Sequence, residues 1–312
     1  MRVIEKINVD EFKAHLDNEI KVELRQNFDS AWNSLSKEEL NKFSFWYQFW
    51  WWLYLILESL CTCFINSFWM HKHGYFVHRQ AIRDKFVAGV DGEGLYIKAS
   101  KAIKGVDITE YRKFESTDDI FKNRRKGIPY DATVINATPV AMLSFKDQYL
   151  GVLRMGRLMW TRSNGKTEQT YYANTAYMEI HVTNFKETNF QLYYRNTLGK
   201  GTLLENRLFN KQFELKSSDE QDARLIFTPL VQEELLGIKA SSEKFKWDLQ
   251  YRNNKIIMKW KPDSWQDSYC SAYKVKFKDK ERTFNTIYLE LKKNLLDLHT
   301  ISYVATLPMV GR

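Results

Sequence analysis

The N-terminal forty residues alternate apolar and polar positions with a helical period. From residue 9 to residue 40, apolar side chains recur every three or four positions among charged ones. They are Phe12, Leu16, Ile20, Leu24, Phe28, Trp32 and Leu35. The spacing predicts an amphipathic helix, which either docks on the main domain or a partner or is an ordinary helix beside a membrane segment. Ser36 and Glu39 have the spacing of a capping box, which indicates that a new helix begins there.

Residues 43–70 form an almost uninterrupted apolar run, FSFWYQFWWWLYLILESLCTCFINSFWM, in which Glu58 is the one charge. A helix rises about 1.5 Å per residue, so the run is long enough for one membrane crossing and too short for two. Tryptophans near both ends are typical of the two membrane interfaces. Six polar residues share one face of such a helix: Ser44, Gln48, Glu58, Ser59, Thr62 and Asn66.

Three arrangements of this run fit its composition. It is a spanning helix that associates through its polar stripe, an interfacial helix that lies flat, or a buried helix of a soluble protein. A charge at mid-membrane is costly, so Glu58 would be protonated, face a partner helix, or indicate incomplete insertion. We expect the spanning arrangement, self-association through the stripe, and a location at the cell membrane.

From Gly151 onward the pattern becomes that of strands and turns. Residues 151–162 and 169–183 are strand-like, and Asn164-Gly165 between them predicts a hairpin because both central positions of such a turn need positive φ. Further strands are predicted at residues 189–195, 212–217, 244–252 and 255–261, with the last two joined at Asn253-Asn254.

Helical segments interrupt these strands. Thr228-Pro229 is a strong helix start, and Gly237 is placed to end that helix. A second helix is predicted at about 282–298, and a short one after Gly74. The apolar stripe of the second helix is Phe284, Ile287, Tyr288, Leu291, Leu295 and Leu298. The fold class predicted is α+β, with a mainly antiparallel sheet covered by helices. The domains predicted are 1–42 (amphipathic helical), 43–70 (membrane helix) and 71–312 (basic α+β).

The net charge of +9 is unevenly distributed along the chain. Residues 71–312 hold 40 basic and 28 acidic side chains. This excess suits the anionic cytoplasmic leaflet of a membrane or nucleic acid, or is simply a solvated basic surface. The densest basic run is a candidate phosphate-binding loop and comprises Lys122, Arg124, Arg125 and Lys126.

The cysteines and the N-terminus bear on the compartment. Cys61 and Cys63 lie in the apolar run and Cys270 stands alone, which argues against a disulfide framework and favours a reducing compartment. The first residues are charged throughout, so we expect no signal peptide there.

Motifs for catalysis, cofactors and metals are weak. Gly199-Lys200-Gly201-Thr202 lacks the first glycine and the hydroxyl residue of a phosphate loop. His71, His73 and His78 lie close in sequence, but no cysteine or carboxylate follows at a metal-ligand spacing. No catalytic group can be assigned, and we predict neither a cofactor nor a metal site.

Residues 208–236 carry the most specific pattern of the chain. Phe209-Asn210-Lys211 is followed by Phe213, then Asp219 with Ala223-Arg224, then Thr228-Pro229. This order resembles an uncharacterised bacterial membrane family, a domain of unknown function common among mollicutes and present in some proteobacteria. The resemblance extends over residues 75–305 and implies a cytoplasmic α+β domain behind membrane helices, without an activity or a cofactor. Similar proteins usually have two membrane helices in a hairpin, whereas this chain has a single apolar run.

The motif residues also have structural explanations. Phe209 and Phe213 suit the core, Asp219 suits a cap or turn, Arg224 suits an ion pair, and Thr228-Pro229 starts a helix.

Three functions stay open. The first is a membrane-anchored, non-enzymatic interaction or scaffold protein that contacts a protein partner or anionic lipid. The second is a soluble or peripheral nucleic-acid-binding protein, and the third is an enzyme whose site is assembled from dispersed residues.

Overall fold

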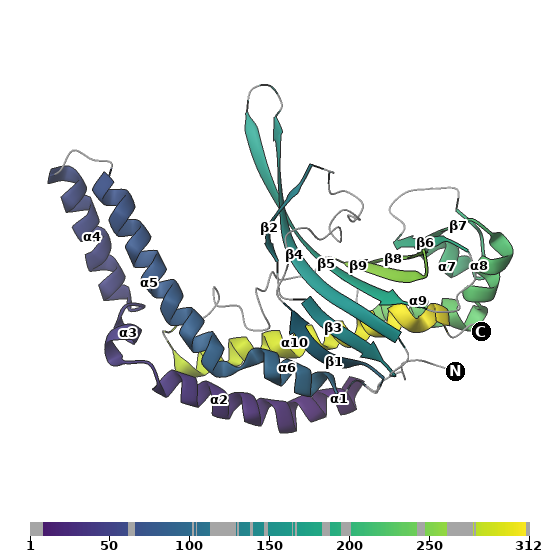
Figure 1. The fold of residues 1–312 in the computed structure, drawn as a ribbon, viewed down its shortest axis with the longest axis horizontal. Coiled ribbons are helices and arrows are strands. Elements are labelled where there is room, and N and C mark those ends of the chain that lie inside the picture. The colour runs from purple at the N-terminus through teal and green to yellow at the C-terminus, as the bar shows by residue number, and fades with distance from the viewer. Residues whose placement is uncertain are drawn as a thin grey trace. The chain divides into compact units, whose positions relative to one another are not determined.

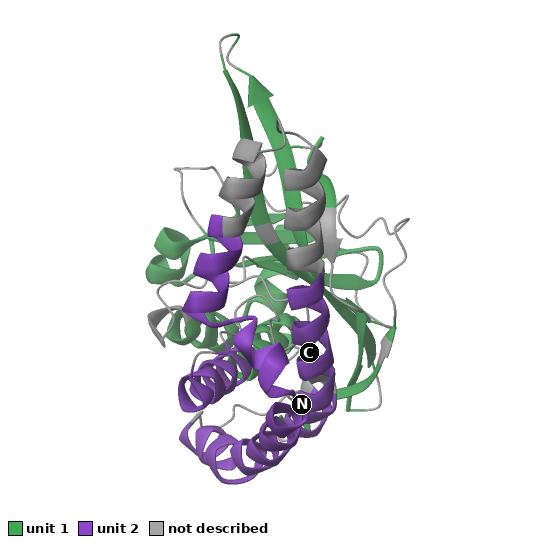
Figure 2. Ribbon diagram, turned by 90° about the vertical axis from the view of Figure 1, so that its left-hand side faces the viewer, with its two compact units in different colours: residues 1–9, 100–266, 295–312 green, residues 10–99, 267–294 purple. Residues whose placement is uncertain are grey.

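A computed structural model describes residues 9–61, 66–101, 103, 105–112, 129, 131–137, 140–146, 149–163, 165, 167–182, 188–194, 201–241, 247–260, 277 and 279–309. The chain divides into two compact units, shown in different colours in Figure 2. Unit 1 comprises residues 1–9, 100–266 and 295–312, and unit 2 comprises residues 10–99 and 267–294.

Unit 2 is helical. In the described residues it contains α1 (Val9–His15), a π-helix (Leu16–Ile20), α2 (Lys21–Asn33), α3 (Lys37–Asn41), α4 (Phe45–Cys61), α5 (Asn66–Val90), α6 (Gly92–Ser100) and the first part of α10 (Lys280–Thr306). The predicted amphipathic helix is confirmed up to Asn33, because α1, the π-helix and α2 follow one another without a break and bury the stripe from Phe12 to Phe28, while Trp32 is half-buried. The capping box is also confirmed: the Glu39 N–H donates to Ser36 Oγ (3.1 Å) and the Ser36 N–H to Glu39 Oε2 (2.7 Å).

An aromatic core holds unit 2 together. The ring of Phe28 on α2 lies 5.5 Å from that of Phe86 on α5 and 5.4 Å from that of Phe284 on α10. Phe277 lies 5.0 Å from Phe86 and 4.5 Å from Phe43. Edge-on and tilted ring pairs at such distances add to the free energy gained by burial. The stripe of α2 therefore packs within its own unit.

The apolar run 43–70 does not form the single long helix that its composition predicts. Helix α4 ends at Cys61 and α5 begins at Asn66, and the two helices lie side by side as a hairpin (Figure 1). A hairpin lets each helix cover part of the apolar surface of the other, which an extended helix cannot do. Within the described residues, no helix combines the length and apolar character that a membrane crossing requires.

Unit 1 contains one antiparallel sheet with nine strands in the described residues. The strands are β1 (Asp107–Arg112), β2 (Thr133–Ala137), β3 (Val140–Phe145), β4 (Tyr149–Ser163), β5 (Glu168–His181), β6 (Phe190–Tyr194), β7 (Phe213–Ser217), β8 (Trp247–Arg252) and β9 (Lys255–Trp260). Their order is β1-β3-β4-β5-β9-β8-β6-β7, and β2 pairs with β4. The predicted α+β class with an antiparallel sheet is confirmed, while β1 to β3 lie where no element was expected.

Both predicted hairpins are present. Ser163 pairs with Glu168 across a turn in which Gly165 has a φ of +81°. Arg252 pairs with Lys255 across the two-residue turn at Asn253 and Asn254, whose φ values are 51° and 57°. Positive φ at both central positions matches the right-handed twist of the strands, and asparagine tolerates it better than most residues.

Helices cover one side of this sheet: α7 (Arg207–Gln212), α8 (Glu220–Ile226), α9 (Pro229–Ser241) and the last part of α10 (Figure 1). Helix α9 begins at Pro229 as predicted, but Gly237 does not end it, because a glycine inside a helix costs only about 1 kcal/mol. The short helix expected after Gly74 is the second half of α5, and α10 extends beyond both predicted limits. The side chains that face these helices are apolar and buried, among them Leu192, Leu215, Leu249, Met258 and Met178.

Candidate functional site

The opposite side of the sheet carries polar and charged side chains. Successive strand residues point to opposite faces, so the alternation in FQLYY, FELKS and WDLQYR gives one apolar and one polar face. We call the polar side of these central strands the polar sheet face. Its polar and charged residues are Tyr177, Glu179, His181, Gln191, Tyr193, Glu214, Lys216, Asp248, Gln250, Arg252, Lys255 and Lys259.

Strand register brings these residues together from distant parts of the chain. Glu214 pairs with Tyr193, Tyr193 with Asp248, Asp248 with Lys259, and Lys259 with Tyr177. These five side chains therefore form one row across five strands, with about 4.8 Å between neighbouring strands. In the adjacent row, Lys216, Gln191 and Gln250 are neighbours in the same way.

Glu179 is the centre of a hydrogen-bonded group on this face. It accepts hydrogen bonds from Tyr177 Oη (2.8 Å) and Lys255 Nζ (2.7 Å), and His181 Nε2 lies 3.1 Å away. Burial by itself would raise the pKa of Glu179, but the bonds from Lys255 and Tyr177 outweigh it and hold the pKa below its usual range. Burial and the charge of Glu179 raise the pKa of Tyr177. The group is thus a carboxylate paired with a cation and a neutral phenol.

Lys259 is the most unusual cation of the polar sheet face. Its side chain is 9% exposed, and it makes no hydrogen bond or ion pair with the residues that the structure describes. Burial lowers the pKa of Lys259 to about 8; Asp248 opposes this shift and Arg252 adds to it. The ammonium form therefore still predominates at pH 7, where about one-tenth of the side chain is a neutral amine.

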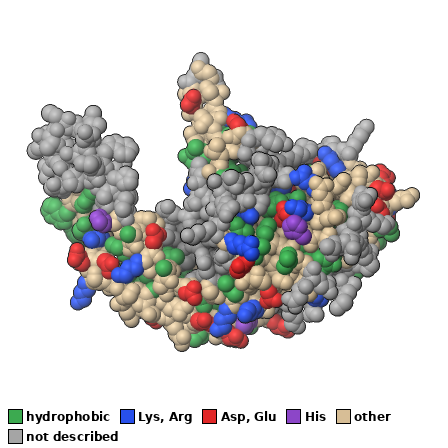
Figure 3. All heavy atoms as spheres, viewed as in Figure 1, with side chains coloured by type: hydrophobic (Ala, Val, Ile, Leu, Met, Phe, Trp, Pro, Cys, Tyr) green, Lys and Arg blue, Asp and Glu red, His purple; other side chains and the backbone are tan. Residues whose placement is uncertain are grey.

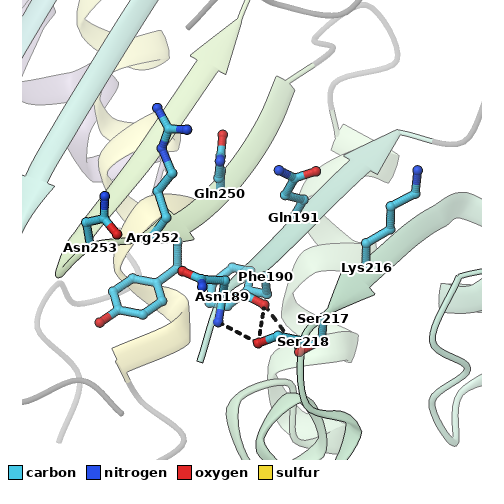
Figure 4. Close-up of a pocket in the computed structure, with 10 residues that line it drawn as sticks. Asn189, Phe190, Gln191, Lys216, Ser217, Ser218, Gln250, Arg252 and Asn253 are labelled. Carbon is cyan, nitrogen blue, oxygen red and sulfur yellow. Dashed lines mark hydrogen bonds between the residues drawn. The ribbon is translucent and has the colours of Figure 1, made fainter. Parts of the chain in front are cut away.

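A cavity of about 460 Å³ lies where β6, β7 and β8 meet the edge of this face (Figure 4). Its lining includes two cations, Lys216 and Arg252, and two side-chain amides, Gln191 and Gln250. Tyr193 Oη donates to Gln191 Oε1 (2.6 Å), and Lys216 Nζ lies 3.3 Å from Glu214 Oε1. No carboxylate is among the described residues that line the cavity.

The end of the β6 and β7 pair closes one side of the cavity. The Asn189 N–H donates to Ser218 Oγ (3.0 Å), and the Ser218 N–H donates to the Asn189 carbonyl oxygen (2.9 Å). Ser217 Oγ donates to the Asp219 carbonyl oxygen (2.7 Å). These bonds fix the backbone here, so the side chains of Gln191 and Lys216 extend from a rigid support.

Unit 2 has a second candidate surface at the start of α4. Six aromatic side chains within eight residues are more than a third exposed, and Figure 3 shows hydrophobic side chains gathered there. We call them the aromatic band: Phe45 (63% exposed), Trp46 (65%), Tyr47 (38%), Phe49 (45%), Trp50 (60%) and Trp52 (42%). Arg79 and Arg83 of α5 stack over the ring of Phe43 at 4.6 and 5.4 Å, next to this band.

The predicted polar stripe is divided between two helices. Ser44 precedes α4 and its Oγ accepts from the Tyr47 N–H (3.2 Å), while Gln48 Nε2 donates to the Phe43 carbonyl oxygen (2.9 Å). These two side chains therefore form hydrogen bonds with the backbone at the start of α4. Glu58 and Ser59 lie in α4 and Asn66 begins α5, but their side chains, like the whole of Thr62, lie outside the described residues. A single face holding all six is wrong, since α4 and α5 are separate helices.

Two other predicted clusters fall largely outside the described residues. The basic run Lys122, Arg124, Arg125 and Lys126 lies there entirely, as do the side chains of His71 and His73. His78 is an exposed residue of α5. Among the described side chains, no three of His, Cys, Asp and Glu are grouped so that they could hold a metal ion.

The first half of the 209–229 motif makes contacts within unit 1. Phe209 and Phe213 are buried, with ring centres 4.8 Å apart. Asn210 binds the backbone of Leu204 twice: its Oδ1 accepts from the Leu204 N–H (3.1 Å) and its Nδ2 donates to the Leu204 carbonyl oxygen (2.7 Å). These contacts tie the loop before α7 to the start of β7.

The second half of the motif starts two helices and links them. Asp219 is the N-cap of α8 and accepts from the N–H groups of Gln221 (2.7 Å) and Asp222 (3.0 Å). Ala223 is fully buried, and Arg224 pairs with Glu205 and donates to the Leu203 carbonyl oxygen (3.1 Å). Thr228 and Pro229 begin α9. The motif residues thus lie beneath the sheet, on the side opposite the polar sheet face.

Part of the chain matches the model of a known family. Residues 158–292 match the model of a family described as a protein of unknown function, DUF3137. The matched segment runs from the middle of β4 into α10 and so includes the polar sheet face and its cavity. No curated protein and no solved structure matches the chain significantly.

Sequence reasoning did not identify the polar sheet face as a site. The alternation in the strands was visible, but it is typical of any strand with one solvated side. The strand order β5-β9-β8-β6-β7 cannot be predicted from the local sequence pattern. This order brings Tyr177, Lys259, Asp248 and Gln191 onto one face.

Proposed function

We propose that the chain is a non-enzymatic interaction protein that docks on the surface of a membrane through the aromatic band. The observation that carries this proposal is the exposure of six aromatic side chains in the first two turns of α4. The proposal is for docking at the lipid interface and not for a spanning helix.

The chemistry of the band suits the interface between lipid and water. A buried aromatic side chain contributes roughly 150–250 Å² of contact area, so a patch of six is large for a surface that faces only water. Tryptophan and tyrosine combine an apolar ring with a polar N–H or O–H group, and both concentrate at the level of the lipid headgroups. Transfer of these rings into the interface supplies a favourable free energy that does not need a complete crossing.

Basic side chains next to the band support an anionic membrane as the partner. The guanidinium groups of Arg79 and Arg83 lie over Phe43, directly before the band, and Lys42 is the preceding residue. Each cation near an anionic surface contributes about 1 kcal/mol of attraction. The basic excess of residues 71–312 suits the cytoplasmic leaflet, so we place that part of the chain on the cytoplasmic side of the cell membrane.

Self-association through residues 43–70 belongs to the same proposal. Glu58 interrupts the apolar sequence of α4, and a charge in an apolar surrounding needs a partner or water. Replacing Glu58 with leucine is expected to change the oligomeric state in detergent. An unchanged state, measured by light scattering, argues against association through this helix and leaves membrane docking intact.

The test is flotation of the full chain with vesicles of phosphatidylcholine and phosphatidylglycerol. A Trp46→Ser/Trp50→Ser variant is expected to lose at least about tenfold in vesicle partitioning, because two large rings no longer enter the interface. The matched control is Leu150→Ser/Tyr172→Ser, which removes two similarly exposed large side chains from β4 and β5. Equal partitioning of the wild type and the tryptophan variant overturns the proposal.

A further inference from the structure

We infer that the cavity between β6, β7 and β8 is a binding site for a small molecule that carries phosphate groups. The cavity lies wholly in unit 1 and involves none of the residues of the aromatic band. The inference is therefore independent of membrane docking.

The charge of the lining selects an anion. Lys216 and Arg252 are the cations among the lining residues, and the remaining side chains are neutral. A phosphate group carries close to two negative charges at neutral pH and offers several strong acceptor oxygens. The planar fork of an arginine donates to two of them at once, and a lysine adds a point charge.

Three of the donors form a row across the strands with Lys216 at one end, and Arg252 lies along β8 from the other end. Lys216, Gln191 and Gln250 are cross-strand neighbours, so Lys216 and Gln250 are separated by about 10 Å, twice the strand spacing. Arg252 lies two residues beyond Gln250 on β8, roughly 7 Å further along the strand. Figure 4 shows all four side chains extending from the same side of the sheet. This separation fits a ligand with more than one anionic oxygen group, such as a diphosphate or a phosphorylated sugar.

Existing hydrogen bonds orient the donors toward the cavity. Because Tyr193 Oη occupies Gln191 Oε1 (2.6 Å), the Gln191 NH2 group is the part of that amide left to donate to a ligand. Lys216 Nζ lies 3.3 Å from Glu214 Oε1, and the lysine side chain is 55% exposed. Because an ammonium group has three N–H donors, it can also donate to a second anion. A volume of about 460 Å³ lies within the usual range for small-molecule sites.

The test is calorimetric titration of the full chain with sodium pyrophosphate. Lys216→Gln and Arg252→Gln each remove a charge and keep a side-chain hydrogen-bond donor, and each is expected to weaken binding at least about tenfold. The control, Arg162→Gln, makes the same change at an exposed position of β4 and is expected to bind as the wild type does. Thermal melts of all variants verify that the fold is intact.

A second arm identifies the source of the phosphate. Vesicles that contain a phosphatidylinositol phosphate are compared with vesicles of phosphatidylcholine. Pyrophosphate binding that depends on Lys216 and Arg252 supports a soluble ligand, and vesicle binding with the same dependence but without pyrophosphate binding supports a lipid headgroup. Binding of neither probe, or binding unaffected by both substitutions, overturns the inference. A third result also overturns it: a single-stranded oligonucleotide binds in a way that depends on Lys216 and Arg252, while neither pyrophosphate nor the vesicles bind. The occupant would then be a nucleic acid.

Discussion

Lys259 and Asp248 are cross-strand partners on the polar sheet face, in β9 and β8. The carboxylate favours the charged form of Lys259, yet burial of the ammonium group dominates and brings its pKa to about 8. The ordinary value is 10.5, so folding discriminates against the protonated amine. Burial of the protonated Lys259 is thus unfavourable at neutral pH despite Asp248, and this cost disappears when the amine loses its proton.

The first prediction concerns stability against alkaline pH. Between the folded pKa and the ordinary value, the unfolded chain binds more protons at Lys259 than the folded chain does, so this residue makes stability rise with pH above about 8. In Lys259→Met this increase in unfolding free energy is expected to be absent. Urea unfolding at pH 7.5 and at pH 10 measures it. Lys216→Met, which removes an exposed lysine from the same face, is expected to keep it. A rise that persists in Lys259→Met contradicts the assignment.

A second prediction concerns Glu179. Its folded pKa lies below the usual 4.5, so its contribution to stability is present above that value and is lost as pH falls through the folded pKa. Glu179→Gln is expected to cost about 1–3 kcal/mol at pH 7, because Lys255 and Tyr177 lose a charged acceptor. The difference from the wild type should shrink at pH 3. Glu168→Gln, an exposed position on the same strand, serves as the control and should be nearly neutral.

His299 on α10 predicts a sensitivity to mild acid. Burial lowers the pKa of His299 from 6.5 to about 4, so the unfolded chain binds the extra proton between these values and stability falls as pH drops through this window. The loss between pH 7 and pH 5 is expected to be about 2 kcal/mol. In His299→Gln the fall in unfolding free energy between pH 7 and pH 5 should be smaller by that amount, and an unchanged fall would assign the acid sensitivity elsewhere.

The turn between β8 and β9 gives a prediction that separates backbone from side-chain effects. Asn254 has a φ of 57°, and its Oδ1 accepts a hydrogen bond from Tyr251 Oη (3.1 Å). Asn254→Ala is expected to cost about 2 kcal/mol because it loses that bond and places a poorly tolerated residue at positive φ. Asn254→Gly loses only the bond and should cost less, about 1 kcal/mol or below. Equal costs in thermal unfolding would mean that the backbone conformation contributes nothing.

Local signals predicted the elements that depend on a few neighbouring residues. Positive φ at Gly165 and Asn253 and the start of α9 at Pro229 each follow from the chemistry of one or two side chains. The stripe of α2 was equally clear, because its period alone predicts a buried face. By contrast, β3 has almost no alternation, since its residues are buried on both sides, and β1 contains a register shift between Ile108 and Glu110. Such strands give weak sequence signals.

The division of the apolar run and the polar sheet face could not be predicted. Residues 43–70 contain no glycine or proline, so nothing local indicates that α4 ends at Cys61 and α5 begins at Asn66. The polar sheet face depends on pairing between strands that are distant in sequence, such as β5 and β9, whose partners range from His181 with Lys255 (74 residues apart) to Ala176 with Trp260 (84 residues apart). Long-range pairing is a property of the folded chain and leaves no periodic pattern.

Quenching of tryptophan fluorescence by brominated phospholipids tests membrane docking most directly. Trp46, Trp50 and Trp52 are exposed in the aromatic band, and their replacement by phenylalanine keeps an aromatic ring at each position while removing the fluorophore. We predict that brominated vesicles quench the wild-type chain and that the triple phenylalanine variant floats with the same vesicles but is quenched much less. Absence of quenching in the wild type, or equal quenching of both proteins, would contradict docking through the aromatic band.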